Sequence, residues 1–372
     1  MTTLNQPTPT GRLYSLDALR GFDMFWIIGG EEIFHSLARV TGNTILQKVA
    51  HQFTHPAWNG FRLYDLIFPL FLFLAGVSTP FSIGKKLEAG ASKQQLLIKV
   101  IKRGLILVLL GIVANNGLEI TPIAEMRFGS VLGRIGLAYM FANFIYLYSG
   151  LRAQAIWFVG ILIGYWLLMK FTAAPGFPAG DLTREGNFAS WFDRTVLPGK
   201  LYEGIHDPEG LLSTVPAIST ALLGILAGTL LRLGKISGAK KAGYLAIAGV
   251  VSLLIAQLWN LDFPFNKNLW TSSFVLHVGG LSLLLLSLFY YIIDVLGYQR
   301  WSYFFRVIGM NSILIYISGR FIDWEYATNG FFQWLGQLVG DPFNVVVMAA
   351  CLVLVKWMFL FVLYRAKIFL RV

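Results

Sequence analysis

The chain has 372 residues, of which 56% are hydrophobic and only 13% are charged. Soluble domains carry about 25% charged residues, so this composition excludes a soluble globular enzyme, a disordered chain and a disulfide-stapled secreted module. It favours a protein embedded in a lipid bilayer. The formal net charge of +11 then reflects the lysines and arginines that orient membrane helices, and it does not indicate a nucleic-acid partner.

About ten apolar stretches approach the roughly 20 residues that a membrane-spanning helix needs. They are residues 16–37, 63–83, 102–118, 130–148, 153–171, 211–231, 242–258, 270–293, 304–322 and 344–364. We therefore predict an all-α polytopic membrane protein with long external loops. Residues 1–372 are expected to form one domain, a single bundle of about ten transmembrane helices.

The charges in the connecting segments predict the orientation of the bundle. An even number of spans places both termini on one side, and more than half of the 30 lysines and arginines fall in segments on that side. The positive-inside rule therefore predicts cytoplasmic termini, with residues 1–14 as a cytoplasmic tail. Three long external connections follow, of which residues 39–62 are the first. Residues 172–210 are expected to fold over the mouth of the bundle, and residues 323–343 to hold a short aromatic-bearing helix.

Ionisable residues within the first span are costly in lipid and therefore mark internal ion pairs or a functional site. Asp17, Arg20 and Asp23 are three residues apart, so all three can share one helix face. They are either a salt-bridge network near the cytoplasmic end or a place where Arg20 meets a phosphate. Glu31 and His35 share a face near the external end, where the carboxylate can fix the tautomer of an imidazole.

The segment before the second span is more informative. Pro56 disfavours helical geometry at His55, so this histidine is expected on a rigid irregular piece, with Asp65 one to two turns into the next helix. An imidazole can take a proton near pH 7 or carry an acyl group. The alternative is a loop histidine that is hydrogen-bonded to the backbone.

Other polar groups allow two interpretations each. Lys267 and Trp270 are either site residues or ordinary interfacial anchors. The pair Gly224 and Gly228, four residues apart, is expected to allow close helix packing. The sequence shows no Cys/His cluster with metal-ligand spacing, so we predict no metal.

Six motifs together resemble the transmembrane acetyltransferases typified by lysosomal heparan-α-glucosaminide N-acetyltransferase and its bacterial relatives. They are residues 12–21 (RLYSLDALRG), 55–60 (HPAWNG), 65–69 (DLIFP), 207–210 (DPEG), 266–270 (NKNLW) and 309–313 (GMNSI). They span nearly the whole chain, and six motifs together are more specific than any one of them.

The resemblance implies transfer of an acetyl group from cytoplasmic acetyl-CoA to the amine of a glucosamine-type sugar on the external side. The catalytic histidine of the family falls on His55, and the position of a family asparagine near the end of the first helix holds Glu31. With this mechanism we assign the acetyl-CoA phosphates to Arg20, Arg103 or Arg134. Glu31, with Glu32 or His35, is expected to orient His55. The residues expected to bind the sugar are Asn59, Asp65, Asp207, Glu209, Asn266, Lys267, Trp270 and Asn311.

Two other functions fit the same sequence. A membrane scaffold without catalysis is one alternative. The other is an amino-sugar transporter, whose pathway could be lined by the intramembrane residues Asp17, Arg20, Asp23, Asp65 and Arg134. The expected partners are a small amino sugar and membrane lipid. Glycine spacing of this kind serves contacts within one chain or with a second copy of the chain equally, so the oligomeric state stays open. The expected location is a bacterial inner membrane.

Overall fold

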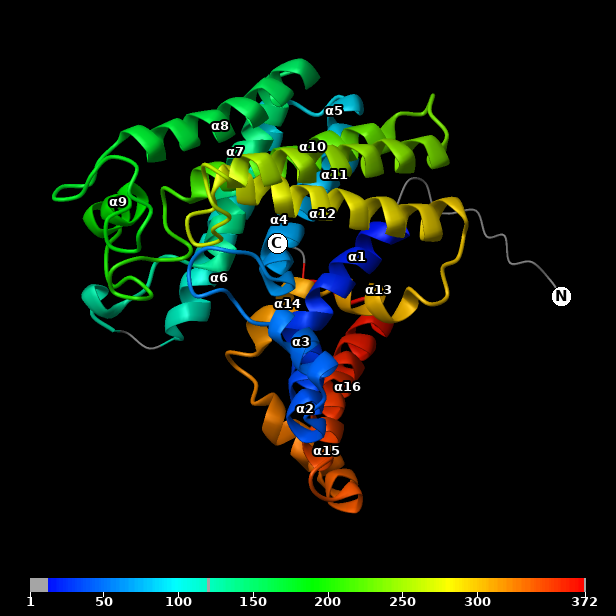
Figure 1. The fold of residues 1–372 in the computed structure, drawn as a ribbon. Coiled ribbons are helices and arrows are strands. Elements are labelled where there is room, and N and C mark those ends of the chain that lie inside the picture. The colour runs from blue at the N-terminus through cyan, green and yellow to red at the C-terminus, as the bar shows by residue number, and fades with distance from the viewer. Residues whose placement is uncertain (1–12, 119–120, 371–372) are drawn as a thin grey trace.

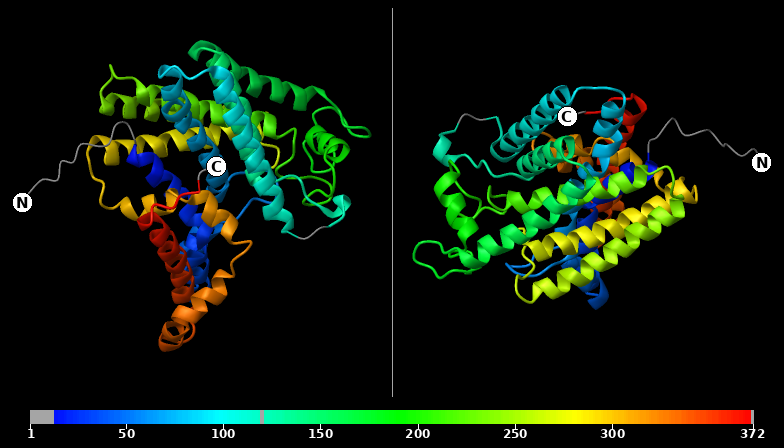
Figure 2. Two further views of the ribbon diagram at one scale, coloured as in Figure 1. Left: turned by 180° about the vertical axis from the view of Figure 1, so that it is seen from behind. Right: turned by 90° about the horizontal axis from the view of Figure 1, so that it is seen from above.

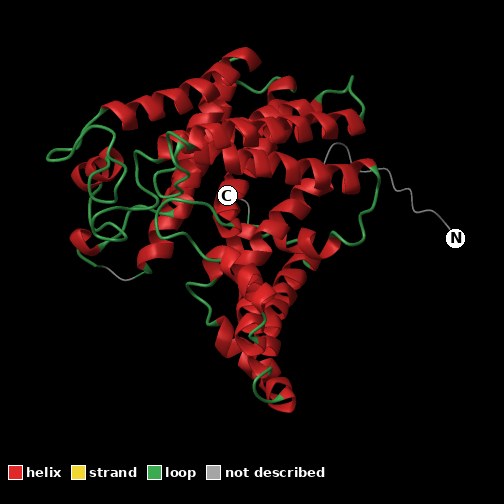
Figure 3. Cartoon of the chain, in the orientation of Figure 1, coloured by secondary structure: helices red, strands yellow, loops and turns green. Residues whose placement is uncertain are grey.

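The computed structural model describes residues 13–118 and 121–370, which fold into helices joined by loops (Figure 3). The predicted tail 1–14 lies almost wholly outside the described residues, as does Arg12 of the first motif. The helices are α1 (Tyr14–Phe25), η1 (Trp26–Gly30), α2 (Glu31–Thr41), α3 (Thr44–Gln52), η2 (Leu63–Leu66), α4 (Ile67–Thr79), η3 (Pro80–Gly84), α5 (Lys85–Glu88), α6 (Lys93–Asn116), η4 (Ile123–Glu125), α7 (Val131–Tyr148), α8 (Leu151–Phe171), α9 (Phe188–Val196), α10 (Thr214–Arg232), α11 (Gly238–Asn260), α12 (Ser272–Tyr290), η5 (Tyr291–Val295), α13 (Tyr303–Gly309), α14 (Ser312–Ser318), α15 (Trp324–Val339) and α16 (Asn344–Arg365).

All ten predicted stretches are largely helical, but in the described part of the chain seven helices are long and apolar enough to cross a membrane. These seven are Leu63–Glu88, Val131–Tyr148, Leu151–Phe171, Thr214–Arg232, Gly238–Asn260, Ser272–Val295 and Asn344–Arg365. The other three predicted spans differ for physical reasons. The first carries five charged residues, α6 begins with a cluster of lysines and arginines, and the ninth is broken into the short helices α13 and α14.

Helix α4 is the centre of the bundle. It packs against α1, α7, α10 and α12, and its residues Leu70, Leu72, Phe73 and Leu74 are almost completely buried. Helices α10, α11 and α12 lie side by side across one part of the molecule, whereas α2, α3, α15 and α16 form a separate projection (Figures 1 and 2). A central helix that touches four others can position groups at both of its ends.

Small residues bring α4 and α10 into backbone contact. A Cβ atom added at Gly224 would overlap with the carbonyl oxygen of Phe73, and one at Gly228 would overlap with that of Val77. The expectation that this glycine pair allows close helix packing is therefore confirmed, and the contact lies within one chain.

Three loops meet at one end of the bundle, which we call the His55 face: residues 53–62, 172–213 and 261–271 (Figure 1). The indole N–H of Trp58 donates to the carbonyl oxygen of Leu182 over 2.8 Å. The backbone N–H of Gly60 donates to the carbonyl oxygen of Phe265, also over 2.8 Å. The second loop contains the nine-residue helix α9. The predicted helix within residues 323–343 is α15, so that expectation is confirmed.

Candidate active site

The centre of the His55 face is a hydrogen-bonded pair of an imidazole and a carboxylate. His55 lies on the irregular segment before α4, as its following proline predicts, and Asp65 lies in the first turn of helix, at η2. The Nδ1 atom of His55 is 2.6 Å from Oδ1 of Asp65. The side chain of Asp65 is 1% exposed and that of His55 is 49% exposed, so the carboxylate is fixed inside the protein and the ring is half exposed.

Backbone and side-chain donors hold this pair in place. The backbone N–H of Arg62 donates to Oδ2 of Asp65 over 3.0 Å, which leaves Oδ1 for the imidazole. The Arg62 guanidinium donates to the carbonyl oxygen of His55 over 2.8 Å and to the hydroxyl of Thr54. The carboxylate therefore selects the tautomer in which Nδ1 carries the proton and Nε2 presents its lone pair.

Lys267 completes the cluster from the loop between α11 and α12. Its Nζ atom lies 3.2 Å from Nε2 and 3.4 Å from Nδ1 of His55, and 3.6 Å from Oδ1 of Asp65. Burial lowers the pKa of the Lys267 ammonium below its ordinary value, although the charge of Asp65 opposes this shift. Three of the predicted residues thus converge on one point from segments more than 200 residues apart.

Asn266 fixes the loop that carries Lys267. Its side-chain oxygen accepts from the backbone N–H of Leu269 over 2.9 Å, and its amide donates to the side chain of Asn59 over 3.0 Å. Asn266 is fully buried, whereas Asn59 is exposed. Of these two predicted sugar-binding residues, Asn59 is available to a ligand and Asn266 positions its neighbours.

Glu31 reaches the site through Tyr64. The Tyr64 hydroxyl donates to Oε1 of Glu31 over 3.3 Å, and the Tyr64 ring centroid lies 5.1 Å from that of His55. The nearby Glu32 accepts from Ser36 and pairs with Arg39. The group that orients His55 in this structure is Asp65, which the sequence analysis assigned to sugar binding.

The acidic residues of the long loop are held by arginine. Both oxygens of Asp207 accept from Arg127, over 2.8 and 2.7 Å, and Glu209 accepts from the same guanidinium over 2.5 Å. Burial, the largest single effect, would raise the pKa of Asp207, but the hydrogen bonds and charge of Arg127 and the backbone hydrogen bonds from Glu209 and Tyr202 together hold this pKa below its ordinary value. Asp207 is thus a fully engaged part of the loop structure, and Glu209 keeps 11% of its side chain exposed.

Arg134 lies near these acidic residues. Its guanidinium donates to the carbonyl oxygen of Gly210 over 3.2 Å and to the hydroxyl of Ser213, and it stacks 4.8 Å from the ring of Trp270. Trp270 is itself fully buried. Both predicted site residues therefore support the loops of the His55 face from within.

A second site lies at the other end of α4, which we call the Arg20 face. A cavity of about 430 Å³ is lined by Asp17, Arg20, Phe71, Ala75, Ser78, Arg103, Gly309, Met310, Ser312, Ile313, Phe369 and Leu370. Arg20 donates to the hydroxyl of Ser78 over 3.2 Å. Among the described residues, Arg103 has a buried Nε atom without a hydrogen-bond partner. Asn311 also lies at this end, where it binds the backbone of Ile368 and Leu370, so the structure separates it from the sugar-binding set.

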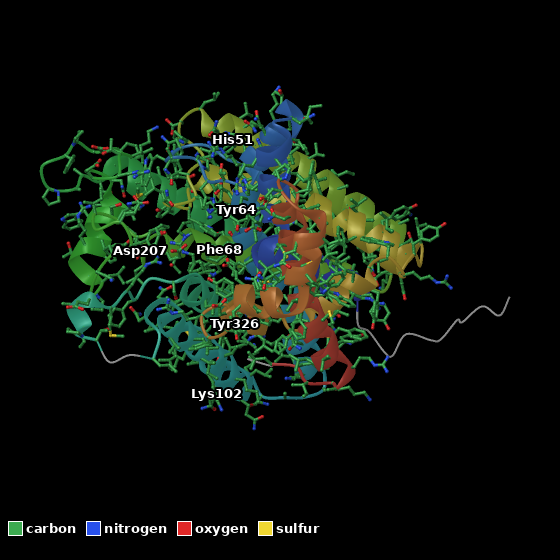
Figure 4. The ribbon with its side chains drawn as sticks, turned by 90° about the horizontal axis from the view of Figure 1, so that it is seen from below. His51, Tyr64, Phe68, Lys102, Asp207 and Tyr326 are labelled. Atoms are coloured by element: carbon green, nitrogen blue, oxygen red, sulfur yellow. The ribbon has the colours of Figure 1, made fainter. Side chains whose placement is uncertain are left out.

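A small apolar cavity of about 40 Å³ lies between the two faces. Phe71 and Ile313 line both it and the Arg20 cavity, and Phe68 and Tyr316 line it toward the His55 face. In Figure 4, His51 and Lys102 lie at opposite margins of the molecule, and Tyr64 and Phe68 lie between them. We call this small cavity the waist.

Comparison with known proteins agrees with the motifs. Residues 12–179 match the family described as Domain of unknown function (DUF5009). Over 97% of its length the chain is 27% identical to heparan-alpha-glucosaminide N-acetyltransferase of Homo sapiens, and over 86% it is 28% identical to the Mus musculus protein of that name. The chain covers 60% and 56%, respectively, of the length of these curated relatives. The chain is therefore related, over nearly its whole length, to the heparan-α-glucosaminide N-acetyltransferases, which confirms the resemblance that its motifs indicate.

Proposed function

We propose that this protein is a transmembrane acetyltransferase that moves an acetyl group from acetyl-CoA at the Arg20 face to the amine of a glucosamine-type sugar at the His55 face. The observation that carries the proposal is the 2.6 Å contact between His55 and the buried carboxylate of Asp65. The relatives named for this activity support the reaction class.

The pair has the chemistry that acyl transfer needs. With its Nδ1 proton held by Asp65, the imidazole of His55 offers a lone pair at Nε2. This atom can attack the thioester carbonyl and carry the acetyl group, or it can take the proton of the sugar ammonium during direct attack. In both routes the carboxylate stabilises the imidazolium that forms, as in the Ser-His-Asp triad.

The Arg20 cavity fits the donor. Acetyl-CoA carries phosphates at one end and the reactive thioester at the other, and guanidinium groups recognise phosphate with paired hydrogen bonds. Arg20 and Arg103 both line this cavity, and the unpartnered Nε of Arg103 is a free donor among the described residues. Together these two arginines would hold the phosphates.

The distance between the faces requires an extended donor. Ser78 at the Arg20 cavity and Asp65 beside His55 are 13 residues apart on one nearly continuous helix. At 1.5 Å per residue this separation is about 20 Å, a large part of the hydrocarbon core of a bilayer. The pantetheine arm of acetyl-CoA would pass the waist to bring its thioester to His55.

The acceptor would approach from the open side of His55. Asn59 is exposed beside His55, and Glu209 keeps part of its carboxylate exposed. An amide and a carboxylate can bind sugar hydroxyls and an ammonium group. This composition suits a cationic amino sugar better than a neutral one.

The test uses purified protein in liposomes, labelled acetyl-CoA and glucosamine. We expect His55→Ala to lose acetyl transfer by at least about 10²- to 10⁴-fold, the range for removal of an acid–base group. The acetyl transfer of Asp65→Asn is expected to fall by a similar factor, because an amide cannot hold His55 in the same tautomer. His51→Ala is the matched control, since His51 is four residues away and exposed at the end of α3.

Sidedness and substrate uptake distinguish the alternatives. We expect transfer only when acetyl-CoA has access to the Arg20 face and the sugar to the His55 face. Full activity of His55→Ala would contradict the assigned mechanism. Accumulation of labelled glucosamine in liposomes without acetyl-CoA would instead establish a transporter, and failure to bind acetyl-CoA would favour a scaffold.

A further inference from the structure

The amine of Lys267 lies beside the ring of His55. Its Nζ atom is 3.2 Å from Nε2 of His55, the atom that would attack the acetyl carbonyl in the route through acetyl-imidazole. It also lies 3.4 Å from Nδ1, so it is beside the ring and not along one lone pair alone. A carbonyl carbon bonded or close to Nε2 would bring its oxygen within reach of the same amine.

Lys267 is held rigidly enough to act in this way. Its loop is closed by a pair of hydrogen bonds between Asn266 and Thr271, each of 3.1 Å, and its own carbonyl oxygen accepts from the backbone N–H of Trp270 over 3.2 Å. The side chain is 19% exposed. A donor that is fixed before the reaction costs no reorganisation when charge appears, which is the condition for strong electrostatic catalysis.

We propose that Lys267 is a further catalytic residue, whose ammonium group donates a hydrogen bond to the oxyanion formed when the acetyl carbonyl is attacked. This inference rests on the proposed acetyltransferase function. It assigns to Lys267 a role in the chemical step, in place of the sugar binding or membrane anchoring that its sequence position suggests.

The step balances by either route. Attack of Nε2, or of the free sugar amine, on the carbonyl carbon moves the C–O π electrons onto oxygen, and Lys267 donates to that oxygen. Collapse of the intermediate re-forms the carbonyl and breaks the C–S bond, with the sulfur leaving as the CoA thiolate. In the route through acetyl-imidazole, the amine then attacks the acetyl group and expels the imidazole. Overall, acetyl-CoA and a sugar ammonium give the amide, the CoA thiol and one proton.

The residue at position 31 explains why the donor to the oxyanion comes from Lys267. A carboxylate at this position would repel an oxyanion, and Glu31 accepts from the Tyr64 hydroxyl over 3.3 Å. In this chain the donor that lies within 3.5 Å of the His55 ring comes from the α11–α12 loop. The Lys267 ammonium therefore supplies the hydrogen-bond donor that Glu31 does not offer.

The experiment compares Lys267→Met, Lys267→Arg and the matched control Lys170→Met, whose amine pairs with Asp262 on the protein surface. At saturating substrates we expect Lys267→Met to lower kcat by about 10²- to 10³-fold, the effect of removing one oxyanion donor. The dissociation constant of acetyl-CoA is expected to stay the same, because the donor acts in the transition state. Lys267→Arg is expected to retain part of the activity, and Lys170→Met all of it.

A chemical rescue excludes a merely structural role. In a Cys351→Ser background, Lys267→Cys can be alkylated with bromoethylamine, which restores an amine that is less basic than that of lysine. We expect this treatment to restore kcat and to move the alkaline limb of the pH profile to lower pH. The groups that face the amine and also affect this profile are His55, Asp65, Glu209 and Arg134.

The two proposals fail in different ways. Normal kcat in folded Lys267→Met, together with an inactive His55→Ala, would overturn the role of Lys267 alone. An alkaline limb that does not move after alkylation would do the same. Absence of acetyl transfer in the unmodified protein would overturn the proposed function itself.

Discussion

At the scale of single residues, burial separates the groups that can react from those that hold them. His55 is half exposed, whereas its partner Asp65 and the loop residues Asn266 and Asp207 are almost completely buried. A buried polar group is stable only when its hydrogen bonds are made, and each of these three has several. The reactive surface of the His55 face is therefore narrow: one ring, one amine and the side chains at its rim.

Asp193 gives a prediction about the pH dependence of stability. Burial raises the pKa of Asp193 to about 6, against the opposing hydrogen bonds from the backbone of Leu212 and Leu211. Because the folded pKa lies above the unfolded value of 3.8, the folded protein favours the protonated form. This contribution is fully present below pH 3.8 and is lost as the pH rises through about 6.

We expect Asp193→Asn to remove this loss of folding stability with rising pH. The loss amounts to about 2–3 kcal/mol for a pKa that is raised by about two units. The amide keeps the oxygen that accepts from Leu211 and Leu212. The measurement is the thermal unfolding midpoint in detergent at pH 4, 5, 6 and 7. The unfolding midpoint of the variant is expected to rise relative to that of the unmodified protein between pH 4 and 7. A constant difference between the two midpoints across this range would contradict the role of Asp193.

Much of the site follows from the sequence, but its connections do not. The pattern around Pro56 predicts an irregular position for His55, and the motifs bring Asp65 and Lys267 into the candidate set. What the spacing cannot give is which carboxylate meets the ring, because Glu31 and Asp65 are both one segment away from His55 and only packing decides between them. Arg134 does not line the Arg20 cavity and Asn311 lies beside Ile368, because the depth of each along a span depends on where its helix begins.

At the scale of elements, the segment after α16 forms one wall of the Arg20 cavity. Phe369 and Leu370 line the cavity, and Asn311 between α13 and α14 fixes this segment through two hydrogen bonds. The Asn311 amide donates to the carbonyl oxygen of Ile368 over 2.8 Å, and the backbone N–H of Leu370 donates back over 2.9 Å. The Asn311 side chain thus pairs with the backbone of residues 368–370, through one hydrogen bond that it donates and one that it accepts.

We expect Asn311→Ala to raise the KM for acetyl-CoA by about 5- to 30-fold, since two hydrogen bonds contribute roughly 1–2 kcal/mol. The expected kcat is nearly unchanged, because the cavity wall is far from His55. Ile368→Ala is the control, as it keeps the carbonyl oxygen that accepts from Asn311. Steady-state kinetics with varied acetyl-CoA measure both constants, and a fall in KM would show that the segment obstructs the cavity.

At the scale of the whole molecule, the two faces lie at opposite ends of one bundle. The loops that carry His55 and Lys267 meet at one end (Figure 1), and the Arg20 cavity, with Ser78 in its lining, lies at the other end of α4. The sequence predicts which stretches are helical, but it does not predict which of them cross the membrane. Charged residues within a helix lower its hydropathy even where they face a cavity. Arg20, Asp17 and Arg103 do this in the first helix and in α6.

Cysteine labelling tests this arrangement directly. Cys351 is buried, so a Cys351→Ser protein is a suitable background for single introduced cysteines. We expect His51→Cys to react with a membrane-impermeant maleimide in intact cells and Lys102→Cys to react only after permeabilisation. Both side chains are exposed in the structure, so accessibility is not in question. Labelling of both positions from one side would contradict the two-faced arrangement.

The narrow waist between the faces has a consequence for the cell. Its lining of Met24, Ile27, Phe68, Phe71, Val131, Leu132, Ile135, Ile313 and Tyr316 offers little to replace the hydration shell of an ion. A slender, uncharged linker arm can fit where a hydrated proton or sodium ion pays a large desolvation penalty. On the proposed function, the protein therefore stays closed to ions while the acetyl group passes from acetyl-CoA at the Arg20 face to a sugar at the His55 face.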